Sequence, residues 1–264
     1  MLRSHFIPTV LVLFSASLFL SATSHATLVK KTVEYKEGST TLEGYLVYDD
    51  TTKGPRPGVL VVHNWLGLTD ETKSKADALA SLGYAAFAAD IYGKGIRPNN
   101  MEGAGKLAGQ YKADRASLRR RVGAGLSTLK KQKVVDPSRV AAIGYCFGGT
   151  TVLELGRSGA AVKSVVSFHG GLDSPKPEDG KNIKAKVLVL AGADDPFQKP
   201  DDLVAFQDEM RKSKVDWQMV SYGGAVHSFT EKGAGTDNSK GAAYNEAADH
   251  RSWQAMQDFF KETL

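Results

Sequence analysis

The chain of 264 residues has a single cysteine, so an internal disulfide is excluded. After residue 26 it has no apolar run approaching the ~20 residues that span a bilayer. It also lacks internal repeats, low-complexity stretches and any break in composition that would divide it into two domains. The excess of positive charge is small, a formal +5, and it is spread along the chain. These absences predict one globular domain without a nucleic-acid partner.

The first 26 residues have the features of a secretory signal peptide. Arg3 provides the positive charge, residues 6–20 are largely apolar, and residues 24–26 form a small-x-small cleavage site. The alternative is an uncleaved membrane anchor, but the apolar run is shorter than the ~20 residues that a span needs. We expect cleavage after Ala26, a mature domain of residues 27–264 without stable membrane insertion, and a periplasmic or secreted location.

Predicted strands and helices alternate along the chain. A hairpin of residues 29–35 and 40–48 comes first. Further strands are expected at residues 59–62, 84–89, 140–144, 162–168, 187–191 and 216–222. Helices are expected at residues 72–82, in two stretches within 99–133, and at 148–156, 201–212 and 245–260. Residues 232–243, which are polar and rich in Gly and Ala, are typical of a flexible surface loop. This order predicts the α/β class, with a mostly parallel, twisted sheet of about eight strands and helices on both faces.

The segment Gly144-Tyr145-Cys146-Phe147-Gly148 follows a predicted buried strand and begins a predicted helix. This is the context of a nucleophile elbow, in which two glycines flank the nucleophile because the tight turn leaves no room for side chains. Backbone N–H groups at the helix start favour a thiolate or an oxyanion. The alternative is a cysteine that only packs as a small apolar side chain. A lone cysteine in an exported protein favours the nucleophile, since oxidising compartments usually hold paired cysteines.

A nucleophile of this kind needs an orienting carboxylate and a base, in that order along the chain. The strand at 187–191 leads to Asp194 and Asp195, and the strand at 216–222 leads to His227. Parallel strands bring both loops to the sheet edge that holds Cys146. We expect Asp195 to be the acid and His227 the base. Asp194 remains the alternative for the acid, and a plain surface histidine is the alternative for His227.

These motifs resemble those of the dienelactone hydrolase (carboxymethylenebutenolidase-like) family of the α/β-hydrolase fold. The resemblance covers most of the mature chain: residues 63–67, residues 89–93, the Cys146 elbow, the Asp195 loop and residues 227–229. It implies a triad of Cys146, His227 and Asp195, with an oxyanion hole formed by the backbone N–H groups of Phe147 and Trp65. It also implies hydrolysis of a small-molecule ester, lactone or thioester through an acyl-enzyme, without a metal ion or organic cofactor, by a monomer or small homo-oligomer.

The sequence departs from the well-known members of that family at two positions. Asn64 occupies the position of a glutamate that is thought to help generate their thiolate. Glu231 occupies the position of an arginine that binds their substrate's carboxylate. Lys106 or Arg115 would be alternative cations. These differences leave open whether the substrate is an anionic lactone, and the absence of the glutamate is consistent with slow turnover.

Other residues near the predicted site have less specific roles. His63 is expected to brace the loop that carries Trp65. Asn64, Tyr92 and His169 are candidates for binding the substrate, although Trp65 and Tyr92 would equally pack beneath the loops. The histidines do not have the short spacing of a metal site. Two other classes of function remain, a non-catalytic small-molecule-binding protein on the same fold and a peptidase or acyltransferase.

Overall fold

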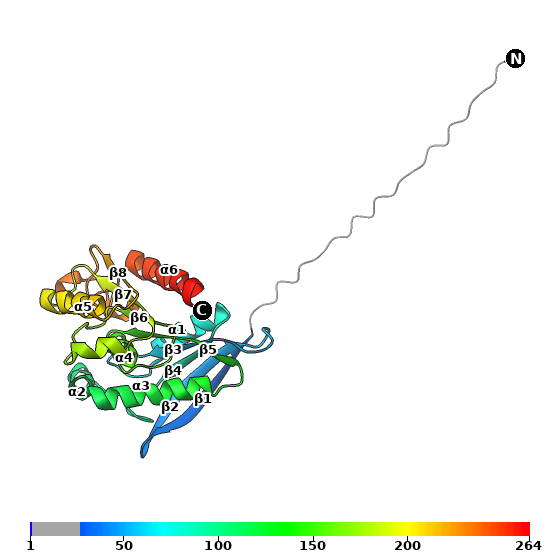
Figure 1. Ribbon diagram of the computed structural model, residues 1–264, viewed down its shortest axis with the longest axis horizontal. Coiled ribbons are helices and arrows are strands. Elements are labelled where there is room, and N and C mark those ends of the chain that lie inside the picture. The colour runs from blue at the N-terminus through cyan, green and yellow to red at the C-terminus, as the bar shows by residue number, and fades with distance from the viewer. Residues whose placement is uncertain (2–26) are drawn as a thin grey trace.

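The computed structural model describes Met1 and residues 27–264, and its centre is an eight-stranded sheet (Figure 1). The strand order is β1-β2-β4-β3-β5-β6-β7-β8. The antiparallel strands are β1 (Leu28–Glu37) and β2 (Thr40–Asp49), and β2 also pairs antiparallel with β4 (Ala85–Ala89). The parallel part joins β4 to β3 (Arg56–Val62), β5 (Val135–Tyr145), β6 (Ser164–Phe168), β7 (Lys186–Gly192) and β8 (Trp217–Tyr222). The predicted α/β class and mostly parallel sheet are confirmed.

Helices cover both faces of the sheet and create two separate cores. One core holds α1 (Asp70–Ser81) and α6 (Glu246–Thr263). The other holds α2 (Met101–Ala113), α3 (Arg115–Lys130), α4 (Phe147–Arg157) and α5 (Pro200–Lys212). In β3, Val59 and Val61 point into the first core and Leu60 and Val62 into the second. Side chains alternate across a strand, so a strand with helices on both faces is apolar throughout.

Short 3₁₀ helices lie in the connecting segments: η1 (Pro177–Asn182), η2 (Lys232–Ala234) and η3 (Asn238–Lys240). The last two fall within residues 232–243, which were expected to form only a flexible surface loop. This segment instead folds back on the site, since His227 and Ala242 form a β-bridge. The polar Gly- and Ala-rich composition gave no sign of this contact.

Strand β5 begins five residues before its predicted start at residue 140. Its first two residues pair with Arg56 and Pro57, and the register then jumps from Asp136 to Val140 opposite Gly58. Pro137 lies in this irregularity. Because proline cannot donate to a sheet ladder, the sequence pattern predicted a strand only after it.

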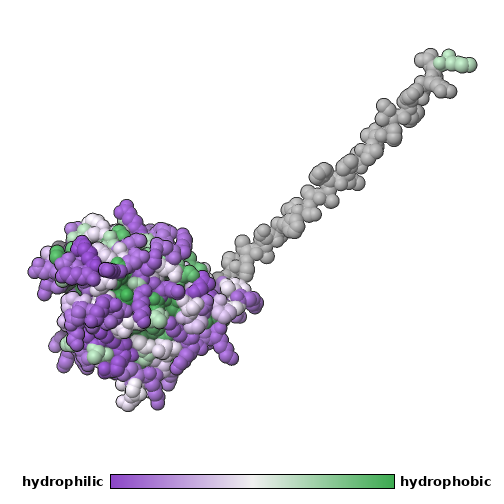
Figure 2. Space-filling model, in the orientation of Figure 1, coloured by the Kyte–Doolittle hydropathy of each residue, from purple (hydrophilic) through white to green (hydrophobic). Residues whose placement is uncertain are grey.

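The predicted signal peptide is residues 1–26, of which residues 2–26 lie outside the described part of the chain. Among the residues that are described, none of the helices combines the length and hydrophobicity needed to cross a membrane. The visible face of the molecule is mostly hydrophilic, with small hydrophobic patches (Figure 2).

Candidate active site

Cys146 lies at the sharp turn between β5 and α4. Its backbone has φ 53° and ψ −113°, a conformation that costs a non-glycine residue about 1–3 kcal/mol. The neighbouring glycines make the turn possible. A Cβ on Gly144 would come within 2.0 Å of the carbonyl oxygen of Gly148, and a Cβ on Gly148 within 2.3 Å of that of Val62. The turn therefore requires glycine on both sides of Cys146 and presents its side chain at the carboxyl edge of the sheet.

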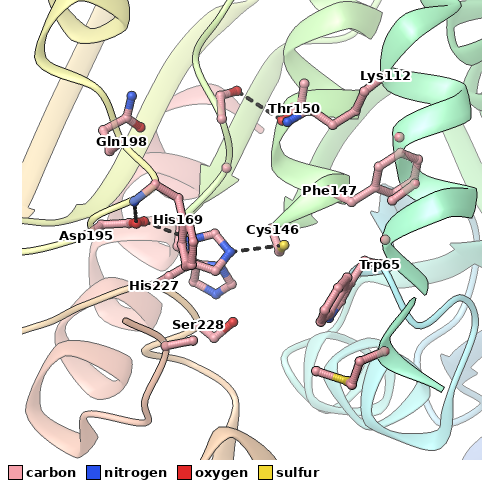
Figure 3. Close-up of a pocket in the computed structure, with 18 of the residues that line it drawn as sticks. Trp65, Lys112, Cys146, Phe147, Thr150, His169, Asp195, Gln198, His227 and Ser228 are labelled. Atoms are coloured by element: carbon pink, nitrogen blue, oxygen red, sulfur yellow. Dashed lines mark hydrogen bonds and ion pairs between the residues drawn. The ribbon is translucent and has the colours of Figure 1, made fainter. Parts of the chain in front are cut away.

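Cys146, His227 and Asp195 form a continuous chain of hydrogen bonds (Figure 3). The Sγ atom of Cys146 lies 3.1 Å from Nε2 of His227. The other ring nitrogen of His227, Nδ1, lies 2.8 Å from Oδ2 of Asp195. The structure thus brings together the three residues predicted for the triad. Asp194, the alternative acid, points elsewhere and accepts a hydrogen bond from the backbone N–H of Gly224 at 2.9 Å.

The surroundings of His227 favour its protonated form. Burial of the ring by itself lowers the pKa, but hydrogen bonds to Asp195 and Cys146 and the negative charges of these groups outweigh it. The net result is a pKa of His227 raised to about 10. At neutral pH the site therefore favours an imidazolium beside the sulfur.

His169, a candidate for binding the substrate, lies beside His227 and lines the same cavity. The two rings meet edge to face at 5.3 Å between centroids, and Nε2 of His169 lies 2.8 Å from the hydroxyl of Thr230. Burial, with a smaller effect from the charge of His227, holds the pKa of His169 well below its usual range. His169 is therefore neutral, and the positive charge of this pair of rings stays on His227.

Two backbone N–H groups next to Cys146 are available as donors. Phe147 is the first residue of α4, where helix N–H groups have no intrahelical acceptor. Neither its N–H nor that of Trp65 donates to a protein acceptor in the described part of the chain. Trp65 and Phe147 both line the cavity, on the side of the sulfur away from His227 (Figure 3). This arrangement can hold a negative oxygen beside the sulfur.

The loop that carries Trp65 is fixed by buried side chains. His63 Nδ1 lies 2.6 Å from the backbone oxygen of Asn64, and His63 Nε2 accepts from the N–H of Ile91 at 3.2 Å. Burial lowers the pKa of His63 to about 4, so the ring is neutral. The hydroxyl of Tyr92 donates to the backbone oxygen of Trp65 at 3.0 Å. His63 thus contacts the loop as expected, and Tyr92 packs beneath it instead of lining the cavity.

A cavity of about 520 Å³ opens above Cys146. Its apolar walls include Trp65, Met101, Phe147 and Phe197. The carboxylate that lines it, Asp195, is engaged by His227, and two lysines, Lys112 and Lys240, add positive charge. The site can therefore accept a largely apolar substrate with a neutral or anionic polar group.

Lys112, which was not predicted from the sequence, reaches the cavity from α2 toward Thr150 (Figure 3). The sequence could have indicated this position, because a helix places on one face the residues with this spacing: Met101, Gly105, Ala108, Gly109 and Lys112. Small residues on that face leave room for the cavity. Of the two cations suggested by sequence, Lys106 is absent from the cavity wall, and Arg115 pairs with Asp173 and Glu154.

Asn64 and Glu231, the two positions where the sequence departs from the family that it resembles, are in contact with each other. The side-chain amide of Asn64 donates to the carboxylate of Glu231 at 3.0 Å. Both residues are buried, and neither lines the main cavity. Asn64 therefore does not face the substrate space as a binding residue, and Glu231 does not place its charge where it would repel an anion. Among the described residues, no cluster of His, Cys, Asp and Glu has the arrangement of a metal site.

Comparison with known proteins places the chain in a family. The sequence profile of the Dienelactone hydrolase family matches residues 42–264. Protein usf of Aquifex pyrophilus is 28% identical over 88% of this chain and 98% of its own length, and a putative carboxymethylenebutenolidase of Aquifex aeolicus is 27% identical with the same coverage. The crystal structure of a dienelactone hydrolase-like promiscuous phosphotriesterase from metagenomic libraries is 43% identical, covering 90% of this chain and 99% of that one, with a TM-score of 0.85.

Proposed function

The chain belongs to the dienelactone hydrolase family and is a hydrolase of the ester or lactone type, and we propose that it works through Cys146 as a covalent nucleophile. One observation carries this proposal. The sulfur is presented in a strained turn, 3.1 Å from a histidine whose other nitrogen is held by a buried carboxylate. A cysteine that served only for packing would need neither the strained backbone nor these partners. Ester hydrolysis by a variant without the thiol tests the proposal.

In the proposed first step, the thiolate of Cys146 attacks the carbonyl carbon of the substrate. A carbon–sulfur bond forms, and the electron pair of the carbonyl moves to its oxygen. That oxyanion accepts hydrogen bonds from the N–H groups of Phe147 and Trp65. As the intermediate collapses, the bond to the leaving oxygen breaks, and this oxygen takes the proton from Nε2 of His227. The products of this step are an alcohol, or the opened ring of a lactone, and an acyl-thioester on Cys146.

In the proposed second step, water releases the acid. Formation of the thioester removes the negative charge of the sulfur, one of the groups that raise the pKa of His227. The ring, now neutral, accepts a proton from the attacking water while Asp195 holds its orientation. The tetrahedral intermediate then expels the thiolate, which restores the starting pair. The scheme needs no metal ion or organic cofactor.

We expect Lys112 to favour substrates that carry a carboxylate. In the described part of the chain it has no acidic partner within ion-pair distance, whereas Lys240 lies 3.8 Å from Asp237. Lys112→Met should lower kcat/KM for the p-nitrophenyl hemiester of succinic acid about 3–10-fold and leave p-nitrophenyl butyrate unchanged, as expected for one exposed charge contact. Lys106→Met removes the same charge from α2 outside the cavity and is the matched control. Equal effects of Lys112→Met on both esters would refute this role.

We also propose that residues 1–26 are an export signal that is cleaved after Ala26. The positive charge, the short apolar run and the cleavage motif support this proposal. Expression of the full chain in a bacterial host should yield periplasmic or secreted protein that begins at Thr27. Sequencing of the purified protein's N-terminus measures this directly. Protein that keeps residue 1 and sediments with membranes would support the anchor instead.

A further inference from the structure

A buried hydrogen bond links the loop of the base to the loop that carries the Trp65 N–H. Glu231 follows His227 by four residues, and its own N–H donates to the backbone oxygen of Ser228 at 2.8 Å. Its carboxylate accepts the side-chain N–H of Asn64, at the start of the other loop, at 3.0 Å. The two residues are 8% and 4% exposed. The bond thus joins positions 167 residues apart in the sequence, on either side of Cys146.

The other end of the Asn64 amide holds the turn that contains Trp65. Its oxygen, Oδ1, accepts the N–H of Leu66 at 2.9 Å. The backbone oxygen of Asn64 accepts the N–H of Gly67 at 3.3 Å, which closes the same turn. Both neighbours of Trp65 in the chain are therefore fixed by hydrogen bonds: the side chain of Asn64 bonds to Glu231, and the N–H of Leu66 bonds to Asn64. The direction of its own N–H depends on this turn.

We propose that Glu231 is a positioning residue that, through Asn64, fixes the Trp65 N–H for the oxyanion of the reaction. This inference rests on the proposed function, in which that N–H stabilises the intermediate. The reason lies in the chemistry of the pair. An ionised carboxylate only accepts hydrogen bonds, whereas an amide has one donating and one accepting end. Glu231 thereby dictates that Nδ2 faces it and that Oδ1 faces Leu66.

Removal of the acceptor at position 231 would leave a buried N–H group of Asn64 without a partner, which destabilises the observed orientation. The amide would then turn or move toward water, and the turn at Trp65 would lose a fixed bond. Catalysis by oxyanion donors depends on their being held in place before the reaction, so such loosening affects the transition state more than the bound substrate. A buried charge is also costly to keep. Burial raises the pKa of Glu231, the hydrogen bond from Asn64 opposes this rise, and the charge of Glu71 reinforces it.

Four variants test the proposal, assayed with p-nitrophenyl butyrate at about pH 8, where free carboxyl groups are ionised. Glu231→Met, which cannot accept the bond, should lower kcat about 10–100-fold with KM within about 2-fold. Glu231→Gln keeps an accepting oxygen and should stay within about 3-fold of the wild type. Asn64→Asp places two acceptors face to face and should be as impaired as Glu231→Met. The double variant N64D/E231Q restores a donor and an acceptor in reversed order, so its kcat should recover to within about 5-fold of the wild type.

A second readout separates positioning from general stability. A trifluoromethyl ketone forms a tetrahedral adduct with the thiol, so its affinity should fall in parallel with kcat in Glu231→Met and Asn64→Asp. The affinity for butyrate, the planar product, should stay unchanged. If Glu231→Met does not fold, as judged by circular dichroism, the two variants that contain Asn64→Asp decide the question.

The proposal is overturned if folded Glu231→Met retains the wild-type kcat, or if N64D/E231Q is no more active than Asn64→Asp. These outcomes differ from failure of the proposed function. If Cys146→Ala keeps full activity, the function itself is wrong. If Cys146→Ala is inactive while Glu231→Met is fully active, only the positioning role is wrong.

Discussion

Replacement of Cys146 by alanine is expected to lower kcat/KM for p-nitrophenyl butyrate by about 10³–10⁵-fold, since it removes the attacking atom. The two backbone N–H groups and the cavity remain in this variant, so some residual rate above that in water is expected. Alanine fits the strained turn no worse than cysteine does, because both have a Cβ. Thermal unfolding should therefore change little, and the loss of rate should not be a loss of fold.

The serine variant is the matched control for this substitution. Cys146→Ser places a hydroxyl in the same turn, within reach of His227, so it should retain more activity than Cys146→Ala. Its mechanism must differ, because a hydroxyl is not ionised near neutral pH and needs a neutral histidine to take its proton. Activity of Cys146→Ser should therefore rise with pH as His227 loses its proton. Equal rates of the wild type and Cys146→Ala would mean that the thiol takes no part in the chemistry.

The second large effect is expected for Asp195→Asn, at about 10²–10⁴-fold in kcat/KM for a simple alkyl ester. The carboxylate accepts from Nδ1 of His227, and an asparagine can instead donate to it and so favour the wrong tautomer. Asp194→Asn is the matched control in the same loop. Its carboxylate accepts only from the N–H of Gly224 and does not touch His227, so this variant should stay within about 3-fold of the wild type.

The pH dependence of Asp195→Asn is an independent test of the role of Asp195. His227 has its pKa raised to about 10, and Asp195 is one of the causes. The protonated ring gives a proton to the leaving oxygen of an alkyl ester, so the wild-type rate should fall only as pH rises toward 10. Asp195→Asn removes a cause that raises the pKa, and its alkaline fall should therefore begin at lower pH. An alkaline limb at the same pH in both proteins would contradict this role for Asp195.

The fold was predictable from the sequence because most of its helices and strands have a strong local pattern. Buried strands such as 59–62 are apolar throughout, and the helix at 72–82 stops at Gly83. The errors have physical causes. The start of β5 was missed because Pro137 is atypical of a strand. Residues 232–243 contact the site through the bridge between His227 and Ala242, which no local sequence pattern indicates.

The sequence predicted which residues of the site lie close together where strand direction determines their position. It did not predict contacts that depend only on how side chains are oriented. Parallel strands bring the loops of Cys146, Asp195 and His227 to one edge, so their proximity follows from strand direction. The contact between Asn64 and Glu231 does not follow from any spacing, because it joins two loops through side chains alone. Each residue looked like a departure from its family when considered separately, and only the structure shows that they form a pair.

The most direct test of Cys146 as nucleophile is to trap the acyl-enzyme. His227→Ala removes the base that activates water, so a p-nitrophenyl ester should acylate the thiol and stop there. At about pH 9, where free thiols ionise, the account predicts one equivalent of released p-nitrophenol and one acyl group per chain, mapped by mass spectrometry to Cys146. An acyl group on another residue, or none at all while the wild type hydrolyses the same ester, would contradict it.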